Sequence, residues 1–260
     1  MRLTFLGTGT SFGVPVIGCQ CAVCTSVDPH DRRTRHAALL EDDEGSHRLL
    51  VDAPPELRLQ LVAARVRDID AVWFTHCHAD HVHGIDDLRA FSARQGRPVA
   101  AFADEACAAT LRERFDYIFG PDLPPVAGVT RPDIQLRVVR PDQPIDVAGF
   151  RLLPLAVPHG DQRCLAFRVG ELGYVTDAKD LPPDVRAALA GVRVLVLNAL
   201  WFGDPHPTHL TIEQAVGIGQ EIGAERTYLT HLSHRQSHTE ILAALPPGFE
   251  PAYDGLVVEL

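Results

Sequence analysis

The chain has 260 residues, with 24 Lys and Arg against 34 Asp and Glu and a formal net charge of −10 at pH 7. Hydrophobic residues make up 46% and charged residues 22%, which is ordinary globular usage and excludes a disordered or collagen-like chain. The acidic balance disfavours extended nucleic acid as a partner, because a negative surface repels a polyanion. No apolar stretch approaches the roughly 20 residues that cross a bilayer, so we expect no membrane association.

The six cysteines are divided between a cluster and scattered positions. Three lie close together, at Cys19, Cys21 and Cys24. The other three are spread over the chain, at Cys77, Cys107 and Cys164. With 13 histidines in the same chain, this distribution indicates metal binding rather than disulfides. The first residues lack the apolar core of a secretory signal, so we expect a cytoplasmic protein.

The first half of the chain alternates short apolar strands with polar or glycine-rich loops. We expect strands over 2–6, 36–40, 48–52 and 71–74, with a hairpin joining the second to the third. Glycines and Pro15 break the first strand and begin a long loop that contains the cysteine cluster. Helices are predicted over 54–66, 86–93 and 104–115.

The second half is richer in strands. They are expected over 136–140, 150–157, 164–169, 172–176, 192–197, 226–230 and 256–259, with helices over 182–190, 211–222 and 239–245. The segment 119–132 is rich in Pro and Gly but short, which favours a surface loop over a domain boundary. We therefore predict a single α/β domain over 1–260, with two sheets packed face to face and helices outside.

The densest signal directly follows the predicted strand over 71–74. Three histidines and one carboxylate fall within six positions, at His76, His78, Asp80 and His81. Imidazole and carboxylate are ligands of zinc, manganese and iron, and a loop at a strand end can direct alternate side chains toward one point. The alternative is a polar surface loop without a metal, but four potential metal ligands at this spacing favour a metal site. We interpret the segment as a site for one or two metal ions.

Two metals need more ligands than this loop holds, and three candidates follow other predicted strands. They are His159, Asp177 and His231, each at the carboxyl end of an apolar run. Each alone is typical of a cap or a surface residue. Because strand ends of one sheet converge on one edge, their joint occurrence indicates a shared site.

Cys19, Cys21 and Cys24 lie in a loop at about 13–35 and supply three of the four ligands that a structural zinc site requires. His234 is our candidate for the fourth, because it lies three residues beyond His231 and one loop could then serve both metal sites. Reduced thiols without a metal are the alternative.

Two further patterns in the first loop do not predict chemistry. The segment 9–13 reads G-x-S-x-G, but the serine hydrolase motif needs a helix directly after it, and Pro15 and Gly18 exclude one. Residues 7–9 begin a dinucleotide-binding fingerprint, yet Phe12 replaces its third glycine. We predict neither a nucleophilic serine nor a nucleotide cofactor.

The pattern His-x-His-x-Asp-His at 76–81 resembles the signature of the metallo-β-lactamase superfamily. The later ligands of that superfamily match His159, Asp177 and His231 in order, so the resemblance covers nearly the whole chain. It implies an αββα sandwich of two mixed β-sheets with helices on the outer faces. The segments 7–9, 13–15, 19–24, 230–234 and 248–255 are most similar to the phosphoribosyl 1,2-cyclic phosphate phosphodiesterases of the carbon-phosphorus lyase pathway.

The resemblance implies a ligand set for each metal. The catalytic pair would be held by His76, His78 and His159 on one side and by Asp80, His81 and His231 on the other, with Asp177 bridging. It implies manganese at this pair, whereas many relatives use zinc. It also implies a structural zinc at Cys19, Cys21, Cys24 and His234.

Two residues are implied to be catalytic. His209 falls where the phosphodiesterases keep a catalytic histidine, and Asp80 would both ligate a metal and orient the nucleophile. The segment 201–207 departs from the pattern expected there, which leaves the leaving-group pocket open. The expected reaction is hydrolysis of a small cyclic phosphodiester by a metal-bridging hydroxide, with phosphoribosyl 1,2-cyclic phosphate as the candidate substrate.

Alternatives stay open. A lactonase or another ester or amide hydrolase would use the same metals on a carbonyl group, and a carrier similar to the pyrroloquinoline quinone biosynthesis protein B would keep the fold without catalysis. Transfer RNA processing is disfavoured by the acidic balance. A homodimer is compatible with the sequence. Arg32, Arg33 and Arg35 are either phosphate ligands or a solvated loop face, and His83 is either a neighbour of the metal ligands or exposed.

Overall fold

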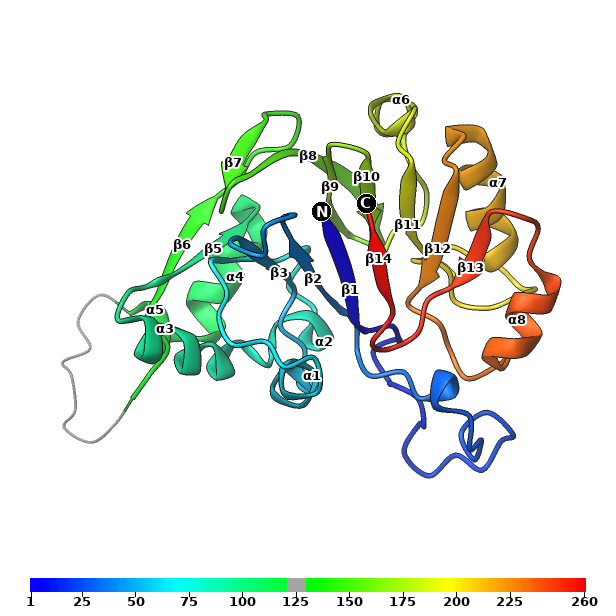
Figure 1. The fold of residues 1–260 in the computed structure, drawn as a ribbon, viewed down its shortest axis with the longest axis horizontal. Helices are drawn as coiled ribbons and strands as arrows, with labels where there is room; N and C mark the ends of the chain where they lie inside the picture. The colour runs from blue at the N-terminus through cyan, green and yellow to red at the C-terminus, as the bar shows by residue number, and fades with distance from the viewer. Residues whose placement is uncertain (121–129) are drawn as a thin grey trace.

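Two β-sheets pack face to face in the computed structural model, which describes residues 1–120 and 130–260, and helices cover both outer sides (Figure 1). Each sheet contains seven strands and mixes parallel with antiparallel pairs. The αββα sandwich expected from the sequence is confirmed. Most of the surface loop expected over 119–132 lies outside the described residues.

The first sheet consists of β1 (Arg2–Gly7), β2 (Ala37–Glu41), β3 (Arg48–Val51), β4 (Ala71–Trp73), β5 (Val99–Ala103), β6 (Ile134–Val138) and β14 (Val257–Glu259). The second consists of β7 (Ile145–Val147), β8 (Phe150–His159), β9 (Gln162–Val169), β10 (Leu172–Val175), β11 (Val194–Asn198), β12 (Arg226–Thr230) and β13 (Phe249–Pro251). The helices are η1 (Pro29–Asp31), α1 (Leu57–Ala63), α2 (Ala79–Val82), η2 (Ile85–Leu88), α3 (Arg89–Gln95), α4 (Glu105–Arg114), α5 (Asp116–Phe119), α6 (Pro183–Leu189), α7 (Ile212–Ile222) and α8 (His238–Ala244).

The sequence misses β5, β7 and β13. β5 is rich in alanine, which has low strand propensity, and the other two strands have only three residues each. The helix expected over 54–66 is shorter and begins at Leu57, and the helix expected over 86–93 begins as the 3-10 turn η2 before α3. No helix directly follows the segment 9–13, as Pro15 and Gly18 predict.

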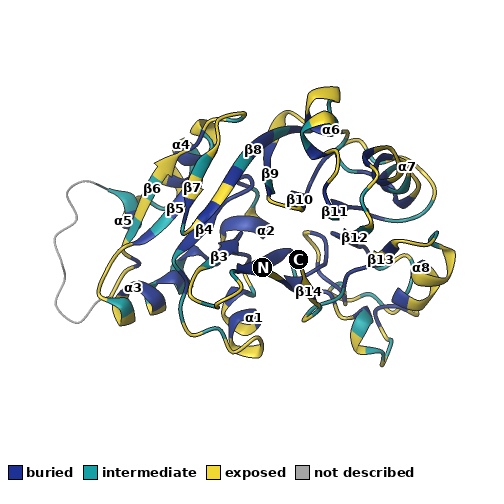
Figure 2. Ribbon diagram, turned by 45° about the horizontal axis from the view of Figure 1, so that its top comes forward, coloured by how far each residue is buried: buried dark blue, intermediate teal, exposed yellow. Residues whose placement is uncertain are grey.

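The hydrophobic core has one layer between the sheets and one layer under each group of helices. Trp73 and Phe167 contact each other across the sheets, and the ring of Phe167 stacks on Tyr174 with centroids 5.1 Å apart. The central strands are buried on both faces (Figure 2), and all five residues of β11 are buried. Such strands form continuous apolar runs, which is why the sequence predicts them well.

Parallel strands set the position of the site. β3 pairs with β4 in the first sheet, and β10, β11 and β12 pair in the second, all in parallel. The carboxyl ends of parallel neighbours meet at one edge of a sheet, where loops with functional side chains follow. Because the two sheets pack face to face, the carboxyl ends of β4, β8, β10 and β12 lie in the same region of the molecule.

No helix in the described ranges combines the length and the apolar character required to cross a membrane.

The expectation that the cysteines serve metals rather than disulfides is wrong for one pair. Cys77 and Cys107 form a disulfide, with Cα atoms 5.3 Å apart. Cys77 lies between two histidines of the predicted metal loop, and its side chain reaches α4. The disulfide therefore ties the metal loop to a helix of the outer layer.

Replacing Cys107 by alanine should lower the free energy of unfolding by about 3 to 4 kcal/mol under non-reducing conditions, because the disulfide closes a long loop in the unfolded chain. Urea unfolding with and without a dithiol reductant measures this difference. The reductant should bring the native chain and Cys107→Ala together.

Cys164→Ala is the matched control, because Cys164 is a buried free thiol and this variant should keep the native response to the reductant. If Cys107→Ala is destabilised equally with and without the reductant, the loss comes from packing and not from the disulfide.

Candidate metal centre

The loop after β4 and the short helix α2 carry four of the predicted ligands. His76 lies three residues beyond the end of β4, and Asp80 and His81 lie in the single turn of α2. The carbonyl of His78 accepts a hydrogen bond from the amide of His81 at 3.0 Å, which folds the loop back on itself. This turn gives alternate residues of the motif a common direction.

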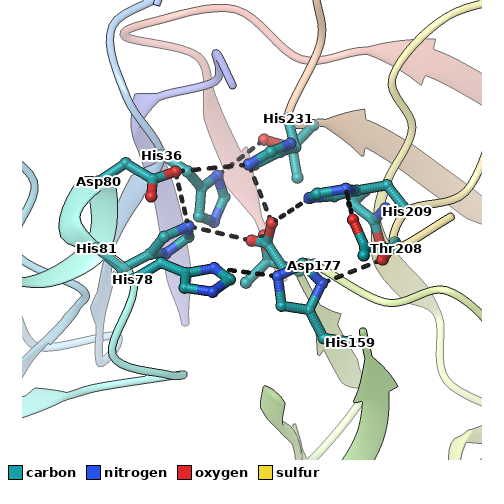
Figure 3. Close-up of polar contacts among 12 residues, drawn as sticks. His36, His78, Asp80, His81, His159, Asp177, Thr208, His209 and His231 are labelled. Atoms are coloured by element: carbon teal, nitrogen blue, oxygen red, sulfur yellow. Dashed lines mark hydrogen bonds and ion pairs between the residues drawn. The ribbon is translucent and has the colours of Figure 1, made fainter. Parts of the chain in front are cut away.

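The other three predicted ligands come from the second sheet. His159 is the last residue of β8, Asp177 follows β10 by two residues, and His231 directly follows β12. All three are at most 2% exposed. The structure therefore brings together all seven residues that the sequence singled out for the metal pair. Figure 3 labels all of them except His76.

His76, His78 and His159 form the first group of ligand atoms. Nδ1 of His78 lies 2.9 Å from Nε2 of His76 and 3.2 Å from Nε2 of His159. Three imidazole nitrogens at these distances cannot all satisfy one another, because a neutral ring has one donor and one acceptor. A cation between them would satisfy all three.

Asp80, His81 and His231 form the second group, with Asp177 between the groups. Nε2 of His81 lies 3.2 Å from the Asp177 carboxylate and Nε2 of His231 lies 3.0 Å from it. Neither nitrogen makes an aligned hydrogen bond within the described structure, although both are buried. Buried nitrogens without hydrogen bonds are rare, so this donor set fits a metal ion.

The carboxylates give the site a negative potential. The pKa of Asp177 is well below its usual range: burial alone would raise it, but His231, His81 and His209 outweigh that effect. The pKa of His81 is raised well above its usual range, because Asp177, Asp80 and Asp52 outweigh its burial. The lowered pKa of Asp177 and the raised pKa of His81 both indicate that positive charge is favoured beside the Asp177 carboxylate. A divalent cation would supply that charge.

His209 adjoins the metal ligands on the side that solvent reaches. Its Nε2 lies 2.7 Å from the Asp177 carboxylate, and its side chain is 14% exposed. Its ring stacks on His231 with centroids 4.8 Å apart. Thr208 contacts Nδ1 of His209 through its hydroxyl, and its carbonyl accepts from Nδ1 of His159 at 3.0 Å. The loop that carries His209 thus also fixes a ligand of the first group.

Asp52 and His36 are functional candidates that the sequence did not reveal. Asp52 directly follows β3 and is fully buried, and its carboxylate accepts from Nδ1 of His81 at 2.7 Å and from the amide of Thr75 at 2.8 Å. Asp177 was predicted as a ligand because it follows the end of a strand. Asp52 would have been predicted in the same way if the expected strand over 48–52 had ended at residue 51, where β3 ends.

His36 packs behind the second group. Its Nε2 contacts the hydroxyl of Tyr174 at 2.6 Å and its Nδ1 contacts that of Thr230 at 3.1 Å. Burial, followed by the nearby charge of His81, lowers the pKa of His36 to about 3, so its ring is neutral. Nothing in the local sequence distinguishes His36 from a histidine that begins an ordinary strand.

Backbone strain is concentrated at the site. Asp52, Asp177 and His231 have φ of 63°, 51° and 59°, and they are three of the six described non-glycine residues in the left-handed region. Each such residue costs on the order of 1 to 3 kcal/mol and persists only where the surrounding structure fixes it. Strain at three strand ends that share one site is typical of functional positions.

The cysteine cluster forms a second group with His234. The Sγ atoms of Cys19, Cys21 and Cys24 each lie 3.4 Å from Nδ1 of His234. Usual Zn–S and Zn–N bonds in a tetrahedron place sulfur and nitrogen about 3.6 Å apart, so the donor set fits zinc. The backbone amide of Cys24 and the imidazole of His234 lower the pKa of Cys21 to about 6, which favours the thiolate ligand.

Two of the three arginines near this loop, Arg33 and Arg35, have protein partners. Arg33 is fully buried, donates to the carbonyls of Ser233 and Gln236, and pairs with Asp31. Arg35 pairs with Glu56, while Arg32 is exposed. Arg33 therefore ties the cysteine loop to the segment after β12.

His83 is exposed, and its ring packs edge-on against Phe115. Of the two roles that the sequence left open for this residue, its exposure favours the second, a histidine exposed to solvent.

A sequence model described as the beta-lactamase superfamily domain matches residues 47–232. The chain belongs to the metallo-β-lactamase superfamily. The fold and the His-x-His-x-Asp-His loop agree with this assignment, and the resemblance inferred from the sequence is confirmed.

The known proteins that this chain resembles are described with different functions. An octanoyltransferase of Porphyromonas gingivalis is 40% identical over 257 residues, which are 98% of this chain and 51% of that protein. The chain thus spans about half the length of this relative. The name of the relative does not say which half carries out acyl transfer. A crystal structure described as a new diphosphatase from the PhnP family has 38% identity and a TM-score of 0.90, covering 99% of this chain and 97% of that one.

Zinc-bound PqqB from Methylobacterium extorquens has a TM-score of 0.79 at 19% identity over the full length of both chains. That likeness shows a shared fold.

Replacing Asp52 by asparagine should weaken metal binding at the pair by about 10- to 100-fold, because the carboxylate that orients His81 is lost. Competition with a chelator measures the affinity, and circular dichroism checks the fold. The control is Asp146→Asn, which changes a carboxylate on an exposed side chain. Native affinity in Asp52→Asn would show that the contact with His81 does not support the metal site.

Proposed function

We propose that this protein is a dinuclear metal-dependent phosphohydrolase that cleaves a small phosphodiester or diphosphate. The observation that carries the proposal is the convergence of two ligand groups on the buried Asp177, with His209 beside them. The relative described as a diphosphatase, 38% identical over nearly the whole chain, supports cleavage at phosphorus. A cyclic phosphodiester such as phosphoribosyl 1,2-cyclic phosphate stays the leading candidate, and a diphosphate linkage is the second.

His76, His78 and His159 would hold one cation, Asp80, His81 and His231 the other, and Asp177 would bridge them. Two divalent cations supply positive charge that lowers the pKa of water and stabilises negative charge on phosphate oxygens. Asp80 would orient the attacking water. Asp52 keeps His81 in one tautomer by accepting its Nδ1 proton, and the carbonyl of Thr208 does the same for His159.

His209 is positioned for proton transfer. Its Nε2 points at the Asp177 carboxylate and therefore at the centre of the site, while Thr208 fixes its other nitrogen. A histidine there can protonate a departing oxygen or donate a hydrogen bond to a phosphate oxygen, because an imidazole ring can both release and accept a proton.

The metal-loaded full chain should hydrolyse bis(p-nitrophenyl) phosphate and should act more weakly on a lactone. Asp177→Asn should lose this activity while circular dichroism shows a native fold, because the bridging charge is gone. Activity confined to the lactone would reverse the assignment. A native chain that hydrolyses neither phosphodiesters nor diphosphates would favour a carrier.

His209→Ala should reduce kcat by about a hundredfold or more on a phosphodiester with an alkoxide leaving group, and by less on one with p-nitrophenolate, which leaves without a proton. His83→Ala is the control, because His83 is exposed and lies against Phe115. An equal loss on both substrates would contradict proton donation and leave phosphate binding as the role of His209.

A further inference from the structure

Cys77 lies in the middle of the metal-binding motif, but its sulfur is not among the candidate ligand atoms. Its neighbours His76 and His78 are both predicted ligands, with their facing ring nitrogens 2.9 Å apart. The side chain of Cys77 instead bonds to Cys107, the third residue of α4. The disulfide therefore attaches the backbone between two ligands of the first group to a helix of the outer layer.

Backbone hydrogen bonds fix the loop on either side of these residues. Before them, the carbonyl of Thr75 accepts from the amide of Leu165, in the second sheet, at 2.7 Å. After them, the carbonyl of His81 accepts from the amide of Ala53 at 2.7 Å. Between these two points, residues 76–78 are held to α4 through Cys77.

α4 is a firm support for Cys77. The carboxylate of Asp104 caps the helix and accepts from the amide of Cys107 at 2.8 Å, and Leu111 in the same helix is fully buried. In the last turn, Nη1 of Arg114 donates to the carbonyl of Cys77 at 2.6 Å. The helix thus holds Cys77 by one covalent bond and one charge-assisted hydrogen bond. Only the covalent bond depends on the redox state of the cysteines.

We infer that Cys77 and Cys107 form a redox switch that sets the metal affinity of the site. The disulfide keeps His76 and His78 in ligand geometry. The dithiol form leaves residues 76–78 freer to move and binds metal more weakly, because the ligands must then be ordered on binding. The inference rests on the metal pair of the proposed function and adds its regulation.

Glutathione disulfide and glutathione are the oxidant and reductant that this switch requires. On oxidation the two cysteine thiols lose two protons and two electrons and form the S–S bond, and glutathione disulfide takes up both and leaves as two glutathione molecules. On reduction two glutathione molecules return the same protons and electrons. The sequence predicts a cytoplasmic protein, and cytoplasmic disulfides are typically transient or redox-sensing.

The burial of the two cysteines couples this exchange to metal binding. Cys77 and Cys107 are each 5% exposed, so an attacking thiolate needs the loop at residues 76–78 to open. A metal held by His76 and His78 opposes that opening. The two equilibria are also reciprocal: the factor by which the disulfide raises metal affinity is the factor by which bound metal stabilises the disulfide.

The test compares the Mn²⁺ affinity of the native full chain in its disulfide and dithiol forms, measured by electron paramagnetic resonance of the free ion. Manganese is the probe because imidazole and carboxylate bind it, whereas thiolate sites such as the cysteine cluster select zinc. Glutathione disulfide prepares the first form and tris(2-carboxyethyl)phosphine the second, and both reagents are removed before the titration. Alkylation after unfolding should count four thiols in the first form and six in the second. The dithiol form should bind Mn²⁺ about tenfold more weakly.

Cys107→Ala should bind Mn²⁺ as weakly as the reduced native chain and should not respond to the phosphine. Cys164→Ala is the matched control, because it removes a buried thiol outside the pair and should keep the full difference between the two forms. Circular dichroism checks that each variant is folded at the temperature of the titration.

A second measurement uses the reciprocity. In a glutathione buffer, saturating Mn²⁺ should raise the equilibrium ratio of disulfide to dithiol in the native chain by about tenfold or more. Equal Mn²⁺ affinity of the two native forms would overturn the switch, as would six thiols remaining after equilibration with excess glutathione disulfide. Hydrolysis of neither phosphodiesters nor diphosphates, with the difference in affinity retained, would instead contradict the proposed function and leave the switch standing.

Discussion

The carboxylate of Asp177 is the group on which the site depends. It is 1% exposed, at the end of a buried strand, and histidines from three other segments of the chain face it. A buried carboxylate is costly unless positive charge compensates it. The imidazoles of His81, His231 and His209 are placed around this charge. The same arrangement fits the two cations of the proposed phosphohydrolase, so the compensation of one charge accounts for the geometry of the whole site.

The segment after β12 connects two candidate metal sites within four residues. His231 lies in the proposed metal pair, and His234 lies in the cysteine cluster. Arg33 holds the carbonyls of Ser233 and Gln236, and the cysteine loop surrounds His234. The cysteine cluster therefore fixes the position of the segment that supplies one ligand of the proposed metal pair.

The sequence predicts the sandwich and the ligand set because the strongest signals are local. Strands such as β11 are buried on both faces and form apolar runs. His159, Asp177 and His231 lie at or within two residues of the ends of such strands. Asp52 escapes that rule because the predicted strand includes it, and His36 escapes it because its contact with Tyr174 runs across the two sheets. The Cys77–Cys107 disulfide escapes for the same reason, since the two residues are 30 positions apart and meet only through the packing of α4. Arg33 resembles a phosphate ligand in sequence but is buried by the loop that it supports.

Anomalous X-ray scattering from crystals of the metal-loaded chain, recorded at the edges of manganese and zinc, tests the central claim most directly. Two peaks should flank the Asp177 carboxylate about 3.5 to 4 Å apart, as in other two-metal sites, and a third should lie among the three cysteines and His234. A single peak near Asp177, or none within bonding distance of its carboxylate, would contradict the account.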